Sequence, residues 1–248
     1  MAFTETIVLH PGAEKNERST QGSTPLGARA VIGDRVFRWT RNGSVALTVN
    51  RLCQESVVVT GHGGDLAIAT AAAINARSVT LTNSTTAITA NQYAGGYLWI
   101  DNEGHCYKIK SHPAESTGTG SVVITLEDDD YLRAALTTAT SNAGLRRNPY
   151  DSVVVNPTTP TGAPVGVTPI AVTASYYFWL QTWGPAAVLT NGTLIVGYMA
   201  SPGATTAGSV DVYPLNSVDG SGQQPIVGVA SRVRPTTEFS LIDLRIAP

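Results

Sequence analysis

The chain has little charge, little sulfur and no long apolar run. Charged residues make up 14% of its 248 positions, where roughly 25% is typical of soluble domains. It contains two cysteines, Cys53 and Cys106, too few for a disulfide framework. No apolar stretch approaches the roughly 20 residues that a membrane helix needs. We therefore expect a reducing compartment, no disulfides and no membrane partner.

The balance of charge is also close to neutral. A net charge of −2 and a pI near 6.1 argue against a nucleic-acid partner, which usually requires a basic face. Arg29, Arg35, Arg38 and Arg41 make the early chain locally basic, either as solvated strand charges or as a docking patch for an acidic neighbour. Low charge opposes self-association only weakly. We expect an assembling protein, although a monomer with a Thr-rich surface has the same composition.

Turn residues and short apolar runs indicate an all-β fold, with an antiparallel sandwich or barrel-like body and few short helices. Residues 1–27 include a polar, aperiodic stretch and are predicted to form an extended N-terminal arm that is ordered by a partner. Two β-rich regions follow, 28–155 and 156–248, joined at the Pro/Thr-rich segment 156–165. These two regions could also form one continuous domain.

Alternating apolar and polar residues locate the individual strands. Ala30–Leu47 predicts a hairpin that turns at Asn42–Gly43. The richest apolar stretch, Tyr176–Tyr198, predicts two strands around a Gly–Pro turn, the first with Tyr177 and Trp179 on one face and Phe178 on the other. Asp65–Asn75 is the best helix candidate by propensity. Further strands are expected at 56–60, 78–82, 97–101, 106–109, 122–126, 169–173, 187–189, 193–198, 209–213, 226–230 and 239–246.

No set of residues indicates catalysis. Gly61–Gly64 carries His62 in a loop like the oxyanion loop of esterases, but the chain has no Gly-x-Ser-x-Gly elbow. His62 is therefore interpreted as incidental to a flexible loop. Paired carboxylates of a glycosidase need not be adjacent in sequence, and none is assigned here. We predict a protein that is not an enzyme and has no cofactor.

A metal site is not expected either. His105 and Cys106 are adjacent on a predicted strand and so point to opposite faces, which leaves Cys106 as a small core residue and His105 and His112 at the surface. Glu127–Asp130 lacks the spacing of a calcium loop. We interpret that acidic run as a solvated turn and expect a short turn to run from it through Leu136.

Several blocks of the chain resemble structural proteins encoded beside the major capsid gene of tailed bacteriophages. The resemblance lies in Pro25–Ala30, Gly33–Trp39, Asn42–Leu47, Gly104–Lys110, Tyr177–Pro185 and Pro225–Ala230. It implies a capsid cement or decoration protein that binds the major capsid protein on the outer shell. Such proteins are symmetric oligomers, often trimers, so the resemblance implies a homotrimer assembled in the host cytoplasm and resident in the virion.

The expected interface residues follow from this reading. Phe37, Trp39 and the arm are the first candidates for contact with a neighbour, and the cations Arg35, Arg38 and Arg41 accompany them on the same strand. Trp179 and Trp183 are candidates on the later aromatic strand. The alternative is a tail or fibre protein that binds host glycans, in which Trp179 and Trp183 would stack on sugar rings.

Overall fold

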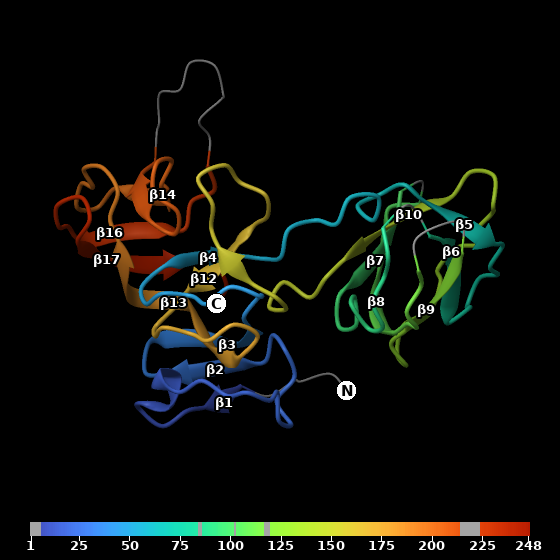
Figure 1. Cartoon of the computed structure of the whole chain (residues 1–248), viewed down its shortest axis with the longest axis horizontal. Helices are drawn as coiled ribbons and strands as arrows, with labels where there is room; N and C mark the ends of the chain where they lie inside the picture. The colour runs from blue at the N-terminus through green and yellow to red at the C-terminus, as the bar shows by residue number, and fades with distance from the viewer. Residues whose placement is uncertain (1–5, 84–85, 102, 117–119, 214–223) are drawn as a thin grey trace, which may run out of the picture. The chain divides into compact units, whose positions relative to one another are not determined.

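The chain divides into two compact units, one of which is inserted into the other. The computed structural model describes residues 6–83, 86–101, 103–116, 120–213 and 224–248. We call Met1–Ser56 together with Tyr150–Pro248 the sheet unit, and Val57–Pro149 the barrel unit. The barrel unit is thus one continuous stretch, while the sheet unit is assembled from the two flanks (Figure 1). This division differs from the predicted boundary between residues 155 and 156.

Six antiparallel strands close the barrel unit on itself. They follow one another around the barrel in the order β10-β5-β6-β9-β8-β7, and each fills it from alternate positions. In β9, for example, Val122 and Ile124 are fully buried and Val123 is exposed, as expected where successive side chains point to opposite faces. The strands are β5 Leu66–Thr70, β6 Ser78–Thr82, β7 Tyr97–Ile100, β8 His105–Ser111, β9 Ser121–Leu126 and β10 Asn142–Arg146.

The helix predicted over Asp65–Asn75 is wrong. Leu66 and Ile68 point into the barrel core while Ala67 faces outward, and β5 pairs with β6 and β10 as a strand. The alanines that favour a helix locally are overridden by cross-strand pairing and burial. The all-β prediction itself is confirmed, and η1 (Ala13–Lys15) is the single 3₁₀ helix of the described residues.

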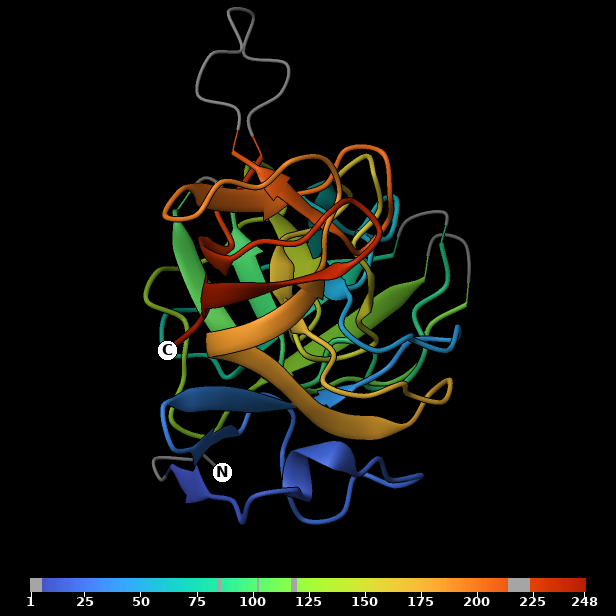
Figure 2. The same cartoon turned by 90° about the vertical axis from the view of Figure 1, so that its left-hand side faces the viewer.

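The sheet unit is built on an open sheet. Its main path runs β1-β2-β3-β13-β17-β16-β14-β15, and β4, β11 and β12 pair beside it. Figure 2 shows β17, β13, β3 and β2 following one another across this sheet. The strands are β1 Ile7–Val8, β2 Arg29–Ile32, β3 Arg35–Arg41, β4 Leu52–Gln54, β11 Val154–Val155, β12 Pro164–Val167, β13 Tyr177–Leu189, β14 Met199–Pro202, β15 Val210–Val212, β16 Gly228–Arg232 and β17 Phe239–Arg245.

Strand β13 is the centre of this unit. Its first half pairs with β3 and its second half with β17, so it joins the two expected strands of the aromatic stretch into one. A bulge between Gln181 and Trp183 marks the change of partner. The Gln181 amide donates to the carbonyl oxygen of Pro185 at 2.9 Å, and Gly184 takes a φ of +80°, which favours glycine. Phe178 and Trp179 are both buried, so both faces of the first half are covered.

The described part of the N-terminal arm is packed against the sheet unit. Strand β1 adds to β2 in parallel, and the apolar side chains of Ile7, Leu9 and Leu26 pack against the cluster around Trp39. Arg18 forms an isolated bridge with Tyr177 of β13. The arm was expected to need a partner for its order, but this chain itself supplies the contacts for residues 6–27; residues 1–5 lie outside the described range.

The predicted turn at Asn42–Gly43 is also wrong. The hairpin of β2 and β3 turns nine residues earlier, where Gly33 has a φ of +59°, as suits the first position of a two-residue turn. Asn42 is buried, and its amide donates to the carbonyl oxygens of Val45 and Thr173, each at 3.0 Å. The Asn42–Gly43 pair therefore makes a close contact between segments and does not form the hairpin turn. The expected strands at 56–60, 169–173 and 193–198 are irregular chain.

Candidate interaction surfaces

The aromatic residues predicted as an interface form a core of the sheet unit. Trp39 lies directly opposite Trp179 in the pairing of β3 with β13, with ring centroids 4.9 Å apart. Tyr177 stacks on Trp39 at 6.3 Å. Phe37 is 0%, Trp39 3% and Trp179 7% exposed. This packing leaves almost none of the three for a partner to contact, while Trp183, beyond the bulge, is only half-buried.

The three arginines predicted beside these rings are engaged within the same unit. Arg35 approaches the Glu14 carboxylate at 3.4 Å, and Arg38 donates to the Pro248 oxygen at 2.8 Å. Arg41 donates to Asp151 at 2.6 Å. Each cation therefore ties β3 to a different segment: the arm, the C-terminus or the chain that returns after the barrel unit. Their charges stabilise the assembly of the sheet unit, which reduces their value as a free basic patch.

Glu14 is the buried member of the first of these pairs. Burial alone would raise the pKa of its carboxyl, but its own backbone N–H, the Gly12 N–H and the Arg35 charge outweigh that effect and lower it. The Gly12 N–H donates to Oε2 at 2.7 Å. Hydrogen bonds that favour the charged form hold such a carboxylate ionised, so Glu14 anchors the arm as an anion.

A different surface of the sheet unit is apolar and exposed. In β17 the side chains of Phe239 and Leu241 point outward, while Ile242 and Leu244 pack in the core. Met199 of β14, which pairs with Val229 of β16, is exposed on a neighbouring strand. The exposed large apolar residues in and beside β14, β16 and β17 are Ile195, Val196, Tyr198, Met199, Ile226, Val233, Phe239 and Leu241. We call these eight residues the outer apolar face.

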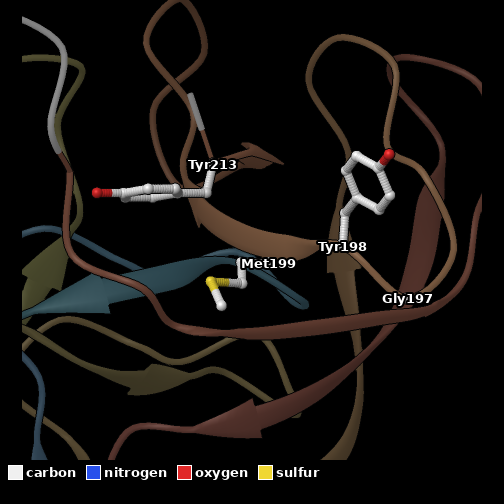
Figure 3. Close-up of a pocket in the computed structure, with 4 residues that line it drawn as sticks. All are labelled: Gly197, Tyr198, Met199 and Tyr213. Atoms are coloured by element: carbon white, nitrogen blue, oxygen red, sulfur yellow. The ribbon is translucent and has the colours of Figure 1, made fainter. Parts of the chain in front are cut away.

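A shallow pocket lies at one end of this face. Gly197, Tyr198, Met199 and Tyr213 line a space of about 200 Å³. Figure 3 shows the Tyr198 and Tyr213 rings on either side of Met199. Both tyrosine rings carry an apolar body and a polar tip, a combination common at interfaces. The sequence signal for this surface was the alternation over residues 239–246, which predicted the strand but not that its outer side would stay uncovered.

In the barrel unit, Tyr93 is held between two buried histidines. The Nε2 of His62 lies 3.1 Å from the Thr86 carbonyl oxygen and its Nδ1 lies 2.6 Å from the Tyr93 hydroxyl. Because a carbonyl can only accept, Nε2 carries the proton and Nδ1 accepts from Tyr93. By the same reasoning, Nε2 of His112 accepts from the Tyr93 N–H at 3.0 Å and Nδ1 donates to Pro113 at 2.8 Å. Both imidazoles are neutral here.

These positions correct three sequence interpretations. His62 is fully buried rather than part of a flexible loop, and His112 is 4% exposed rather than on the surface. Burial lowers the pKa of both histidines. Cys106 was expected in the core, but it is exposed and Cys53 is the buried thiol. Strand pairing decided this exchange. Tyr107 takes the inward position on β8 with His105 on the same side of the strand, while Cys106, which lies between them in the chain, points outward.

Over the described ranges, no group of three or more His, Cys, Asp or Glu side chains is placed to hold a metal ion. Within those same ranges, no helix has the length and apolar character needed to cross a membrane. Comparison with protein-family models, with curated proteins and with solved structures gives no significant match.

Proposed function

We propose that this protein is a virion structural protein of the capsid cement or decoration class. In this role it binds the major capsid protein on the outer shell as a homo-oligomer, the trimer implied by the resemblance, and stabilises the shell without catalysis. The proposal rests on the sequence resemblance in blocks such as Gly33–Trp39 and Tyr177–Pro185. The observation that supports it best is the outer apolar face.

The outer apolar face suits contact between copies of this chain. Contiguous exposed apolar surface is uncommon on monomers and marks interaction sites. Leu241 and Phe239 lie two positions apart on β17, and Met199 comes from β14, so strands supply three of the eight residues. The other five lie in the chain beside these strands. The chain's net charge of −2 provides little repulsion between copies. Several weak contacts of this kind combine into a stable hold on a shell.

The alternative function, a tail or fibre protein that binds host glycans, is weakened at one of the two tryptophans that were predicted to stack on sugars. Trp179 was expected to stack on sugar rings, but its ring packs on Trp39 inside the sheet unit and only 7% of the residue is exposed. Trp183 is half-buried. Neither offers an open aromatic face comparable with the outer apolar face, which therefore favours assembly.

Electron cryo-microscopy of purified virions tests the location. Density for this chain at the junctions between capsomers supports the proposal, whereas density confined to the tail overturns it. A virion without the protein should also lose DNA at a lower temperature than the complete virion.

Sedimentation of the purified protein tests the self-contact. Leu241→Asp places a charge on the outer apolar face and should shift the oligomer to monomers. Val123→Asp is the matched control, because Val123 is 43% exposed on a strand of the barrel unit and should leave the oligomer unchanged. A wild-type chain that stays monomeric at all concentrations would refute self-assembly through this face.

A further inference from the structure

The outer side of the barrel unit carries an aromatic platform flanked by cations. On β7 the outward side chains are Tyr97 and Trp99, since Leu98 and Ile100 point into the core. Strand pairing places them in two rows across β10, β7 and β8. One row reads Arg146, Tyr97, Lys108, and the other reads Gly144, Trp99, Cys106. We call these six residues the platform.

Trp99 lies flat because its neighbours are glycines. A Cβ added at Gly144 would stand 2.2 Å from the indole Nε1, and one at Gly64 would stand 3.2 Å from Cζ2. The indole therefore occupies the space that side chains at these positions would fill. Trp99 is still 37% exposed, so the ring is supported from below and open on its outer side. An open, supported indole is a stacking surface for the flat face of a ligand ring.

The cations give this surface a preference for negative charge. The Lys108 ammonium sits 4.1 Å from the centroid of the Tyr97 ring, which fixes it beside the platform by a cation–π contact. Arg146 is exposed on the other side of Tyr97. A carboxylate near Tyr97 would thus lie between two cations, and charge-assisted hydrogen bonds to such groups are strong.

A nucleic acid fits this site less well than a sugar does. The barrel unit has six Lys and Arg but eight Asp and Glu, whereas binding of a polyphosphate relies on a broadly basic groove. Single-stranded nucleic acid also needs successive open rings for its bases. Here only Trp99 is open, because Lys108 covers the ring of Tyr97. One open ring beside a local pair of cations suits a sugar residue with a single acidic group.

We propose that the platform binds carbohydrate chains that contain carboxylated sugar rings. The C–H face of one ring stacks on the indole of Trp99, and a carboxylate on that ring or its neighbour contacts Lys108 and Arg146. This activity is separate from the proposed attachment to a capsid, because it uses the barrel unit alone. The Trp179 and Trp183 positions take no part in it.

Titration of the full-length protein with oligogalacturonate tests the proposal, with the neutral maltohexaose and the oligonucleotide dT6 as comparison probes. The readout is the set of indole N–H signals in a nitrogen–proton correlation spectrum, where four tryptophans give four signals. Oligogalacturonate should shift the Trp99 signal, which is identified by its loss in Trp99→Phe. The Trp39 and Trp179 signals should stay in place because those rings are buried.

The variants separate stacking from charge. Trp99→Ala should weaken binding about tenfold or more, as expected for the loss of one stacked ring, while Trp99→Phe should retain part of it. Gly144→Ala keeps the indole but displaces it from its support, so it should weaken binding too. Lys108→Gln should weaken binding severalfold and reduce its dependence on salt. Lys110→Gln is the matched control, since that cation is already paired with Asp128 at 2.6 Å.

Each other outcome would overturn the proposal. Equal binding of maltohexaose would remove the role of the cations, and binding of dT6 alone would identify a nucleic-acid site instead. No shift of the Trp99 signal by millimolar oligogalacturonate would show that the platform is not a carbohydrate site. Because these experiments contain no capsid, a negative result leaves the proposed cement function to its own test.

Discussion

The two units of this chain solve the problem of sheet edges in opposite ways. The barrel unit pairs β10 with both β5 and β7 and so closes on itself, which removes free edges. The sheet unit stays open, with β1 and β15 at the ends of its main path. A closed barrel is well suited to insertion into another domain as one stretch. An open sheet keeps surfaces and edges to which other chains can add.

The hydrophobic cores of the two units also differ, in how far apart in the chain their residues lie. The barrel core is mostly aliphatic and is filled from six strands that lie within one stretch of chain. The sheet unit relies on rings contributed by segments far apart in sequence, such as Trp39 and Trp179. Its central contact, β3 with β13, must form across the entire insertion. We therefore expect the barrel unit to be independently stable and the sheet unit to depend on both of its flanks.

The largest expected effect is on the stability of each core. Leu98→Ala in the barrel unit and Phe178→Ala in the sheet unit each remove a fully buried side chain, at an expected cost of about 3–4 kcal/mol. Each should lower the denaturation midpoint of its own unit only. The indole signal of Trp99 reports the barrel unit and that of Trp39 reports the sheet unit during urea titration. Equal shifts in both variants would show that the units unfold together.

The next effect is a response to pH that should separate the units. Burial lowers the folded-state pKa values of His62 and His112, so the unfolded chain binds protons first as pH falls. The barrel unit should therefore keep its full stability above about pH 6.5 and lose it as pH drops through the folded-state values, by about 1.4 kcal/mol per unit of depression. Urea midpoints measured at a series of pH values check this.

His112→Gln is the sharper variant of that experiment. Protonation of His112 at Nε2 would set a donor against the Tyr93 N–H, and glutamine removes that titration. The pH-dependence of the barrel unit should shrink in the variant. The described part of the sheet unit has no buried histidine, so its stability should not change with pH over this range. It should weaken only at lower pH, where Glu14, whose pKa is lowered, becomes protonated.

A smaller difference in stability is expected when one ion pair is broken in each unit. Asp151→Ala leaves Arg41 without its 2.6 Å partner at the point where the chain returns to the sheet unit, and should cost about 1–2 kcal/mol, since water still reaches the guanidinium. Asp128→Ala breaks an exposed pair with Lys110 and should leave the denaturation midpoint of the barrel unit unchanged. A loss of stability in the second variant matching that in the first would contradict this ranking.

The smallest expected effect concerns the reactivity of the two cysteine thiols. Cys106 is exposed on the barrel unit and Cys53 is buried in the sheet unit, where burial raises the pKa of the Cys53 thiol to about 12. The thiolate is the reactive form, so native protein should take up one maleimide, on Cys106, and denatured protein two. Mass spectrometry of the labelled peptides checks the site. Fast labelling of Cys53 in native protein would show that the sheet unit opens locally.

Local pattern located much of the strand content. The alternation in residues 78–82, 122–126 and 239–246 predicted β6, β9 and β17 closely, because one face of each strand packs a core and the other meets solvent. The pattern failed where both faces are buried, as in β13, and where alanine-rich sequence pairs as a strand, as in β5. Alternation carries no information on which partner covers the second face.

The surface residues were harder to predict for the same reason. Trp39 and Trp179 looked like an interface because aromatic residues are common there, yet they cover each other across β3 and β13. Trp99 was not among the predicted interface residues, and it lies open because glycines lie beneath it. Both outcomes depend on pairing between strands that are distant in the chain.

The sequence by itself determined the all-β class, the low charge and the positions of many strands, because these follow from composition and from a two-residue period that local sequence records. Only the tertiary structure decided that the barrel unit closes and is inserted, that His112 is buried while Cys106 is exposed, and which apolar faces remain uncovered. These features are set by the long-range register of paired strands, which local sequence leaves undetermined.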